Sequence, residues 1–290
     1  MAALKRRVTV VIPTFDRASV LPRAVDSVLA QQGADFEVLV ADDGSADDTD
    51  QVLARYAADP RVRILKLPHG GVCRARNAAV AASDTPLIAF LDSDDEWLPG
   101  KLAAQIGLLE ASGGEICQTE EIWIRNGTRV NPPAHYVKRE GDIFALSLKY
   151  CMITPSSVLM TRKLFDRSGG FNPEFPACED YELWLRITHR HAVGLIPKPM
   201  MIRYGGHADQ LSTRFPAQDR FRIRGIALLL DGNALGPAHR ALAVEALEEK
   251  LGIYQAGCEK RGKEEEAAWC RGIRSRYLGD SQIPPAGIAP

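Results

Sequence analysis

The chain has 290 residues, of which 46% are hydrophobic and 25% are charged, and its formal net charge is -1. This is the ordinary composition of a soluble globular protein, and the length fits one large α/β domain with an extension or two small domains. The balanced charge creates no field that would attract nucleic acid or a membrane surface. No apolar run approaches the roughly 18 residues of a membrane-spanning helix, so we expect no transmembrane segment. The six cysteines show no C-x-x-C pair, which favours reduced thiols in a cytoplasm-like compartment.

The first 110 residues alternate short apolar runs with stretches of helical spacing. The apolar runs have the length of strands and cover residues 8–14, 37–40, 62–67 and 87–91. Helical spacing follows each run, at residues 20–29, 47–56, 72–82 and 99–109. Ser19 is expected to cap the first of these helices. The resulting β-α-β-α-β-α-β order predicts a parallel sheet with right-handed crossovers.

The fourth apolar run passes directly into F-L-D-S-D-D-E-W at residues 90–97. Asp92 and Asp94 are two residues apart, so on an extended backbone their side chains point the same way. Two hard oxygen ligands suit Mg²⁺ or Mn²⁺, which accept further oxygens from phosphate and water. Asp95 is expected to cap the next helix. The alternative for the whole stretch is a solvated turn without a ligand.

Polar residues also follow two of the other predicted strands. The first strand ends in Pro13-Thr14-Phe15-Asp16, and the second runs into Asp42-Asp43-Gly44-Ser45. Because the carboxyl ends of parallel strands share one edge, where open α/β sheets bind ligands, we expect these ends to converge on one crevice. The sequence has no Gly-rich phosphate loop, so neither a dinucleotide dehydrogenase nor a P-loop NTPase is supported.

Four motifs occur in order: I-P-T-F-D-R at 12–17, V-L-V-A-D-D-G-S-A-D-D-T at 38–49, G-V-C-R-A-R-N-A-A-V at 71–80 and L-I-A-F-L-D-S-D-D-E-W-L-P-G-K-L at 87–102. Together they resemble the family-2 inverting glycosyltransferases, nucleotide-diphospho-sugar transferases with a GT-A fold. The resemblance is dense to about residue 110 and thinner to about residue 212. It implies an α/β fold of GT-A type: a Rossmann-like, mostly parallel sheet flanked by helices, here with a helical C-terminal extension.

The resemblance also implies roles for residues that bind the nucleotide. Pro13, Thr14 and Asp16 would line the nucleoside pocket, and Asp42 would hydrogen-bond the uracil. Arg76 would lie near the base or the phosphates. Two alternatives need no ligand: Asp16 could cap the helix that follows it, and Arg76 could pair with a surface acid.

For the metal, Mn²⁺ or Mg²⁺, the resemblance implies that Asp94 binds the ion directly. Asp92 would contact the ribose or the ligand shell of the metal. His207, in the sequence Gly205-Gly206-His207, would be a further contact to the metal or the pyrophosphate. The alternative for His207 is an ordinary surface or hydrogen-bonding role.

Glu179 and Asp180 precede an apolar pattern at 181–187 that predicts a helix. Acids in the first turn of a helix are favoured by its dipole alone, so the pair need not be catalytic. In the resembled family, however, an E-D pair followed by a helix with L-W-x-R carries the catalytic base. The resemblance therefore assigns the base to Asp180, with Glu179 as its neighbour or as the alternative.

The second half contains a predicted strand at 115–125 that turns at Asn126-Gly127. We expect a GT-A domain at 1–215, with a nucleotide-sugar half at 1–112 and an acceptor and catalytic-base half at 113–215. Residues 216–290 are expected to form a helical extension with a frayed tail. Its helices could provide a homodimer contact or a peripheral membrane contact.

The expected activity is metal-dependent, inverting transfer of a hexose-type sugar from an NDP-sugar, UDP-linked, to a saccharide or lipid-linked acceptor. Polysaccharide or glycoconjugate synthesis is the expected setting, in the cytoplasm or at the inner face of a membrane, without a nucleic-acid partner. Two rivals remain open. A sugar nucleotidyltransferase would carry a Gly-rich basic loop in place of I-P-T-F-D-R, and a non-catalytic nucleotide-sugar binding module would not need both acidic motifs.

Overall fold

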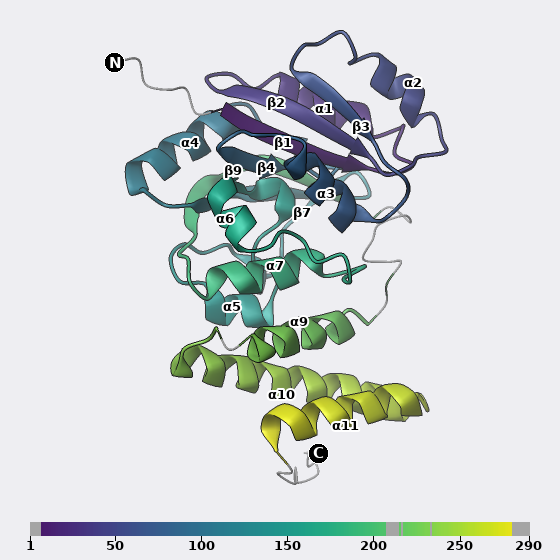
Figure 1. The fold of residues 1–290 in the computed structure, drawn as a ribbon, viewed down its shortest axis with the longest axis vertical. Helices are drawn as coiled ribbons and strands as arrows, with labels where there is room; N and C mark the ends of the chain where they lie inside the picture. The colour runs from purple at the N-terminus through teal and green to yellow at the C-terminus, as the bar shows by residue number, and fades with distance from the viewer. Residues whose placement is uncertain (1–6, 207–214, 216, 233, 280–290) are drawn as a thin grey trace. The chain divides into compact units, whose positions relative to one another are not determined.

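The computed structural model describes residues 7–206, 215, 217–232 and 234–279. The chain divides into two compact units, residues 1–216 and 217–290. The first unit contains the sheet and the second consists of helices, as the labels of Figure 1 show.

The first unit begins with the predicted alternation of strands and helices. Its first strands are β1 (Arg7–Thr14), β2 (Asp35–Asp42), β3 (Val62–Lys66) and β4 (Leu87–Phe90). The helices between them are α1 (Leu21–Leu29), α2 (Thr49–Ala54) and α3 (Val72–Ala81). β1 pairs in parallel with β2 and β4, and β2 pairs in parallel with β3. The predicted parallel sheet is therefore confirmed.

The rest of the first unit extends this sheet. The elements that follow β4 are β5 (Glu96–Trp97), α4 (Lys101–Ser112), β6 (Ile116–Arg125), β7 (Thr128–Val130), η1 (Ala134–Tyr136), α5 (Phe144–Lys149), η2 (Pro155–Ser157), β8 (Leu159–Thr161), α6 (Arg162–Arg167), α7 (Glu179–Thr188) and β9 (Gly194–Gly205). The described strands form one sheet in the order β3-β2-β1-β4-β8-β6-β9-β5, with β7 beside β6. β6 and β7 form a hairpin that turns at Asn126-Gly127, as the sequence predicts.

The strands added after β4 make the sheet mixed. β8 runs antiparallel to both β4 and β6, whereas β9 runs parallel to β6. The register of β6 and β9 shifts on either side of Glu120, which lies opposite Pro199. A proline has no N–H to donate to the ladder, so Pro197 and Pro199 explain the irregularity at this point.

Helices cover both faces of the sheet. The side chains of β1 alternate, so that Val8, Val10 and Ile12 join one core cluster and Val11 joins the other. The first cluster packs against α1, α2 and α4, and the second packs against α3, α6 and α7. The first unit is thus a three-layer α/β structure (Figure 1), and its α/β class is the predicted one.

The start of α1 differs from the expectation. Val20 occupies the position before the helix, and no side chain caps the free N–H groups there. Pro22 lies in the first turn instead, where its missing N–H costs nothing. The prediction that Ser19 caps this helix is therefore wrong.

The second unit consists of α9 (Asp219–Asp231), α10 (Pro237–Lys260) and α11 (Glu264–Leu278). Leu247 and Leu251 of α10 and Ala267 of α11 are fully buried. Asp231 at the end of α9 accepts hydrogen bonds from Arg276 and Tyr277 of α11, at 2.9 Å and 2.6 Å. Among the helices that the structure describes, none combines the length and the apolar character that a bilayer crossing requires.

Candidate active site

Three strands end side by side at the carboxyl edge of the sheet. Thr14, the last residue of β1, lies opposite Asp42, the last residue of β2. On the other side of β1, the Leu91 N–H donates to the Val11 carbonyl at 3.0 Å, so the acidic turn after β4 leaves the sheet beside β1. The loops after β1, β2 and β4 therefore share one edge, as expected of parallel strands.

Asp16 ties the loop after β1 to the loop after β2. Its backbone is left-handed, with a φ of 51°. Its Oδ1 accepts from the Ala46 N–H at 2.7 Å, and its own N–H donates to Ser45 Oγ at 2.9 Å. The alternative that Asp16 caps α1 is wrong, because its carboxylate holds the neighbouring loop.

The predicted nucleoside residues lie at this same edge. Pro13 and Thr14 are buried in β1, and within the described part of the chain the buried Thr14 Oγ1 has no hydrogen-bond partner. Asp42 is 3% exposed, and its Oδ1 accepts from the Ser45 N–H at 3.0 Å. A hydroxyl without a partner beside an acid is a suitable place for a polar ligand.

Asp43 holds the loop between β3 and α3. Its two carboxylate oxygens accept from the N–H groups of Gly70 and Gly71 at 2.9 Å and 2.8 Å. The ring of His69 lies 2.9 Å from the same carboxylate and stacks on Phe15, with ring centroids 4.1 Å apart. Asp43 thus fixes this loop and, through its contact with His69, helps to hold the stacked rings of Phe15 and His69 at the edge of the sheet.

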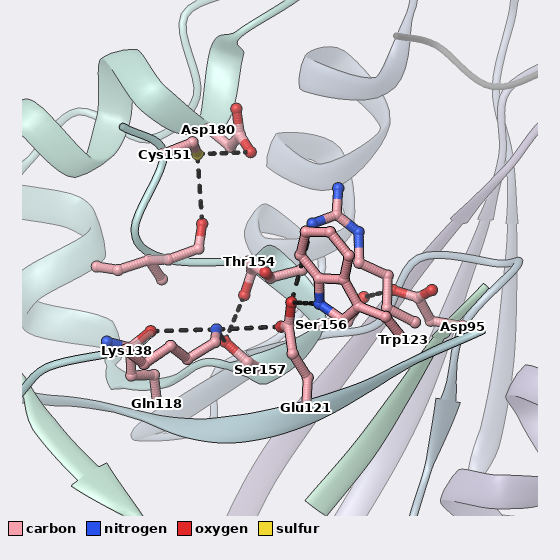
Figure 2. Close-up of polar contacts among 12 residues, drawn as sticks. Asp95, Gln118, Glu121, Trp123, Lys138, Cys151, Thr154, Ser156, Ser157 and Asp180 are labelled. Carbon is pink, nitrogen blue, oxygen red and sulfur yellow. Dashed lines mark hydrogen bonds and ion pairs between the residues drawn. The ribbon is translucent and has the colours of Figure 1, made fainter. Parts of the chain in front are cut away.

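Asp95 is an anchor of the acidic turn and not a helix cap. Its Oδ2 accepts from Ser156 Oγ at 2.6 Å (Figure 2), and its Oδ1 accepts from the Tyr204 N–H at 3.1 Å. Ser156 also accepts from the Asp92 N–H at 3.0 Å. Burial and the nearby charge of Asp94 raise the pKa of Asp95 well above its ordinary value. The predicted cap is wrong because β5 follows this turn and α4 begins only later.

Asp92 and Asp94 differ from Asp95 in being accessible. Asp92 is 30% exposed and Asp94 is half-buried. Among the described residues no three His, Cys, Asp or Glu side chains are grouped to hold a metal ion. Two carboxylates nevertheless fit Mg²⁺ or Mn²⁺, because these ions take their other ligands from phosphate and water. His207, the third predicted metal residue, lies outside the described residues.

Arg76 joins the acidic turn to the E-D pair. Its side chain is 3% exposed, and it donates to Asp92 Oδ1 at 2.6 Å and to Glu179 Oε1 at 2.8 Å. Burial disfavours the charged guanidinium, but the two carboxylates more than offset this and raise the pKa of Arg76 above its ordinary value. Arg76 does pair with acids, of which Asp92 is 30% exposed and Glu179 is buried. The predicted contact with base or phosphate stays a prediction.

The same helix holds the segment that leads to the E-D pair. The Asn77 side chain exchanges two hydrogen bonds with the backbone of Phe171, at 2.7 Å and 3.0 Å. The Cys73 thiol donates to the Phe175 carbonyl at 3.4 Å. Together with Arg76, these contacts make α3 the support that positions the N-terminus of α7.

Asp180 and Glu179 have different surroundings. Glu179 is 5% exposed, and burial, with the adjacent charge of Asp180, raises its pKa to about 7. Asp180 is half-buried, its Oδ1 accepts from the Tyr181 N–H at 2.7 Å, and its Oδ2 accepts from the Cys151 thiol at 3.2 Å (Figure 2). Within the E-D pair, therefore, Asp180 is the residue whose carboxylate a ligand can reach.

For several residues of this site, the sequence patterns do not predict a role. They are Ser156, Asn77 and Cys151, whose hydrogen bonds no sequence motif predicts. Each of these contacts joins residues more than 25 positions apart, and no local periodicity encodes such a pairing. The motif G-V-C-R-A-R-N is the one available signal, because Cys73, Arg76 and Asn77 are three and four positions apart on one helix face.

A mixed sheet of this order, with acids after β2 and β4 and an E-D pair starting α7, defines a glycosyltransferase fold of GT-A type. The profile of glycosyl transferase family 2 matches residues 9–169, more than half of the chain. The chain belongs to this family.

Curated relatives carry related names. An uncharacterized glycosyltransferase of Rickettsia felis is 29% identical over 194 residues, covering 67% of this chain and 32% of that protein. The chain thus spans about a third of the length of this relative. The UDP-Glc:alpha-D-GlcNAc-diphosphoundecaprenol beta-1,3-glucosyltransferase WfaP of Escherichia coli is 31% identical over 190 residues, covering 63% of this chain and 70% of WfaP.

Solved structures share the fold. TarS residues 1–349 of S. aureus in complex with UDP-GlcNAc superpose with a TM-score of 0.74 at 19% identity, covering 94% of this chain and 80% of that chain. The mannosyltransferase PcManGT of Pyrobaculum calidifontis, in complex with GDP-Man and Mn²⁺, gives 0.58 at 16% identity, covering 96% and 84%. The predicted GT-A fold is confirmed.

Proposed function

We propose that this chain is an inverting glycosyltransferase that moves a hexose-type sugar from a UDP-sugar to a hydroxyl of a saccharide or lipid-linked acceptor. The observation that carries the proposal is the Arg76 bridge between Asp92 and Glu179. This bridge links the acidic turn at the sheet edge to the helix that begins with the E-D pair. It supports one site in which the donor diphosphate and the base are neighbours.

In the proposed reaction the acceptor oxygen attacks the anomeric carbon of the donor from the face opposite the diphosphate. A new carbon–oxygen bond forms while the bond between the anomeric carbon and the phosphate oxygen breaks, and its electron pair leaves with UDP. The proton of the acceptor hydroxyl passes to the Asp180 carboxylate. One displacement inverts the anomeric configuration.

Asp180 is the better candidate for the base. Glu179 is buried, and its Oε1 is already bonded to Arg76 at 2.8 Å. An acceptor hydroxyl would have to displace that ion pair before it could reach Glu179. We infer that Glu179 positions the N-terminus of α7 and that Asp180 takes the proton.

Asp94 and Asp92 are the residues that would hold Mg²⁺ or Mn²⁺. The bound cation would supply positive charge that stabilises the leaving diphosphate. Arg23 supports this position, because its guanidinium donates to the Asp94 carbonyl at 2.5 Å and lies over the Tyr204 ring, 3.6 Å from its centroid. His207 as a further contact stays a prediction.

The donor and acceptor classes follow by analogy. WfaP is named for a UDP-Glc donor and a diphosphoundecaprenol-linked acceptor, and the TarS structure holds UDP-GlcNAc. The Thr14 hydroxyl, which has no hydrogen-bond partner among the described residues, lies beside Asp42 at the sheet edge and supports a nucleoside pocket there. Synthesis of a polysaccharide or glycoconjugate from UDP-sugars is the activity that these observations favour.

A transfer assay tests the proposal. The full chain is incubated with UDP-, GDP-, CDP- and TDP-sugars and a panel of saccharide acceptors, with Mn²⁺, with Mg²⁺ and with EDTA. We expect transfer from a UDP-sugar, lost with EDTA, and a product whose anomeric configuration is inverted by NMR.

The Asp180→Asn variant tests the base. We expect transfer to fall by at least about 100-fold, because a positioned general base contributes this much, while UDP still binds. Asp166→Asn, which changes an exposed acid on α6, is the matched control and should transfer normally. Normal turnover by Asp180→Asn would remove Asp180 from the role.

A further inference from the structure

Four aromatic side chains gather outside the residues that the proposed reaction uses. They are Trp123 on β6, His135 and Tyr136 in η1, and Tyr150 directly after α5. The His135 ring stacks on Tyr150, with centroids 4.6 Å apart and planes 25° apart. The Tyr136 centroid lies 4.6 Å from that of His135 and 5.6 Å from that of Trp123. These four residues are called the aromatic cluster below.

The aromatic cluster lies at the surface and not in the core. His135 is exposed, and Trp123, Tyr136 and Tyr150 are half-buried. Only Tyr150 also packs against one of the two core clusters. Large rings that remain partly exposed, each with a polar edge, are typical of ligand sites where one side of the ligand is apolar and the other wet.

The backbone connects the aromatic cluster directly to the proposed base. Tyr150 is followed by Cys151, whose thiol donates to Asp180 Oδ2 at 3.2 Å (Figure 2). Tyr150, which would contact the ligand, is therefore the neighbour in sequence of Cys151, and Cys151 contacts the proposed base Asp180.

A buried ion pair fixes the segment that carries His135 and Tyr136. Lys138 is 5% exposed, and its ammonium lies 3.1 Å from Glu121 Oε2 and 2.9 Å from Ser157 Oγ. It also donates to Gln118 Oε1 at 3.2 Å, and Figure 2 shows these groups converging on the lysine. The cluster is therefore held in a fixed arrangement before any ligand binds, which lowers the entropy cost of binding.

Glu121 links the same ion pair to the cluster. Its Oε1 accepts from the Trp123 indole N–H at 2.6 Å (Figure 2). The guanidinium of Arg203 lies over the Trp123 ring, 5.2 Å from its centroid. Burial alone would raise the pKa of Glu121, but the charges of Lys138 and Arg203 bring it below its ordinary value. Glu121 thus stays ionised and orients Trp123.

We propose that the aromatic cluster binds a pyranose ring of the acceptor saccharide and holds it beside Asp180; this rests on the proposed function. The C–H face of a pyranose is apolar and weakly positive, so it stacks on the negative face of an aromatic ring. The hydroxyl groups around the sugar match the polar edges of the tyrosines and the histidine. An acyl chain would leave those polar edges without partners, so a saccharide is the favoured occupant.

Binding of saccharides to the full chain tests this proposal directly. Saturation-transfer NMR and titrations would use methyl glycosides of glucose, galactose and N-acetylglucosamine, together with lactose, cellobiose and chitobiose, in the presence of UDP and Mg²⁺. We expect at least one of these sugars to bind. His135→Ala and Tyr150→Leu should each weaken its binding about tenfold, whereas Tyr150→Phe, which keeps the ring, should restore it.

Val137→Ala is the matched control, because Val137 lies in the same segment and is 45% exposed. It should bind the sugar like the wild type, and the UDP affinity of every variant should stay within about twofold. Wild-type protein that binds none of the sugars would overturn the proposal. Equal binding by wild type, His135→Ala and Tyr150→Leu would overturn it too, as would capture of a polyprenyl phosphate without any sugar. Failure of the proposed function would show separately, as sugar binding without transfer.

Discussion

Arg76 is buried between two carboxylates that lie far apart in the sequence, Asp92 and Glu179. Loss of the guanidinium would leave the buried Glu179 without its partner, with the charge of Asp92 nearby. Breaking a buried pair in this way costs about 3 kcal/mol or more. We therefore expect Arg76→Met to lower the free energy of unfolding by about 3 kcal/mol, measured by urea denaturation.

Two further variants make this measurement specific. Arg74→Met changes an exposed arginine on the same helix, and it should leave the stability nearly unchanged. Adding Glu179→Gln to Arg76→Met should recover part of the loss, because it removes one of the uncompensated charges. Equal stability of Arg76→Met and Arg74→Met would show that the bridge contributes nothing.

Lys101 is a buried lysine whose charge the fold disfavours. Its side chain is fully buried, its ammonium donates to Gln105 Oε1 at 2.6 Å, and it lies 4.0 Å from the centroid of the Trp97 ring. Burial lowers its pKa from 10.5 to about 7. Between these two values the unfolded chain holds a proton that the folded chain has released, so the contribution of Lys101 to stability rises with pH.

Unfolding measurements at a series of pH values test whether the contribution of Lys101 to stability rises with pH. The difference in unfolding free energy between wild type and Lys101→Met should shift in favour of the wild type by about 1 kcal/mol for each pH unit between 7.5 and 9.5. Lys101→Met should be the more stable protein at pH 6. Parallel stability curves for the two proteins across this range would contradict the shifted pKa.

For single residues, local sequence patterns predict the backbone conformation better than they predict hydrogen-bond partners that are distant in the sequence. Gly44 lies in the turn after β2, where glycine is the usual residue for a positive φ, and its φ is 80°. A Cβ there would lie 3.0 Å from the His69 nitrogen, so the position needs glycine. The partners of Asp95 are different: Ser156 and Tyr204 come from segments 61 and 109 positions away. A propensity for capping could not compete with those tertiary contacts.

Among the elements, the segment from η1 to α5 is joined to its neighbours by a buried lysine, Lys138. Lys138 joins it to β6 through Glu121 and to η2 through Ser157. Without this ammonium the segment loses its ion pair with Glu121 of β6, and Glu121 is left buried with Arg203 3.9 Å away. We expect Lys138→Met to speed amide hydrogen exchange in residues 131–140, because local opening becomes easier.

Hydrogen exchange followed by mass spectrometry measures this effect peptide by peptide. Lys163→Met, an exposed change on α6, should leave the exchange of residues 131–140 as in the wild type. The exchange of β1 and β2 should not change in either variant. Unaltered exchange in residues 131–140 of Lys138→Met would mean that the ion pair does not hold the segment.

Periodicity predicted the first elements well for a physical reason. Strands β1, β2 and β4 are buried on both faces and read as largely apolar runs, and α1 shows one clean apolar stripe. β5 has only two residues and pairs with Met201 and Ile202 of β9. Its existence depends on a strand about 100 residues later, so no local pattern could reveal it.

Over the whole molecule, the parallel half of the sheet was predictable and the rest of its order was not. Right-handed crossovers fix how β1 to β4 connect. The insertion of β8 between β4 and β6 depends on long-range pairing that begins at Ile116 and Leu87. The division of the first unit into nucleotide and acceptor halves stays a prediction, as do a dimer or membrane contact of the helical unit and a cytoplasmic location.

In the proposed site the ends of β1, β2 and β4 hold a nucleoside diphosphate and a divalent cation together. Calorimetric titration of UDP into the full chain, with Mn²⁺, with Mg²⁺ and with EDTA, tests it most directly. Asp94→Ala removes the proposed metal ligand, and Asp84→Ala removes an exposed acid at the opposite end of β4. We expect cation-dependent UDP binding by wild type and Asp84→Ala, weakened at least about tenfold in Asp94→Ala. Binding by Asp94→Ala with the affinity and cation dependence of the wild type would contradict it.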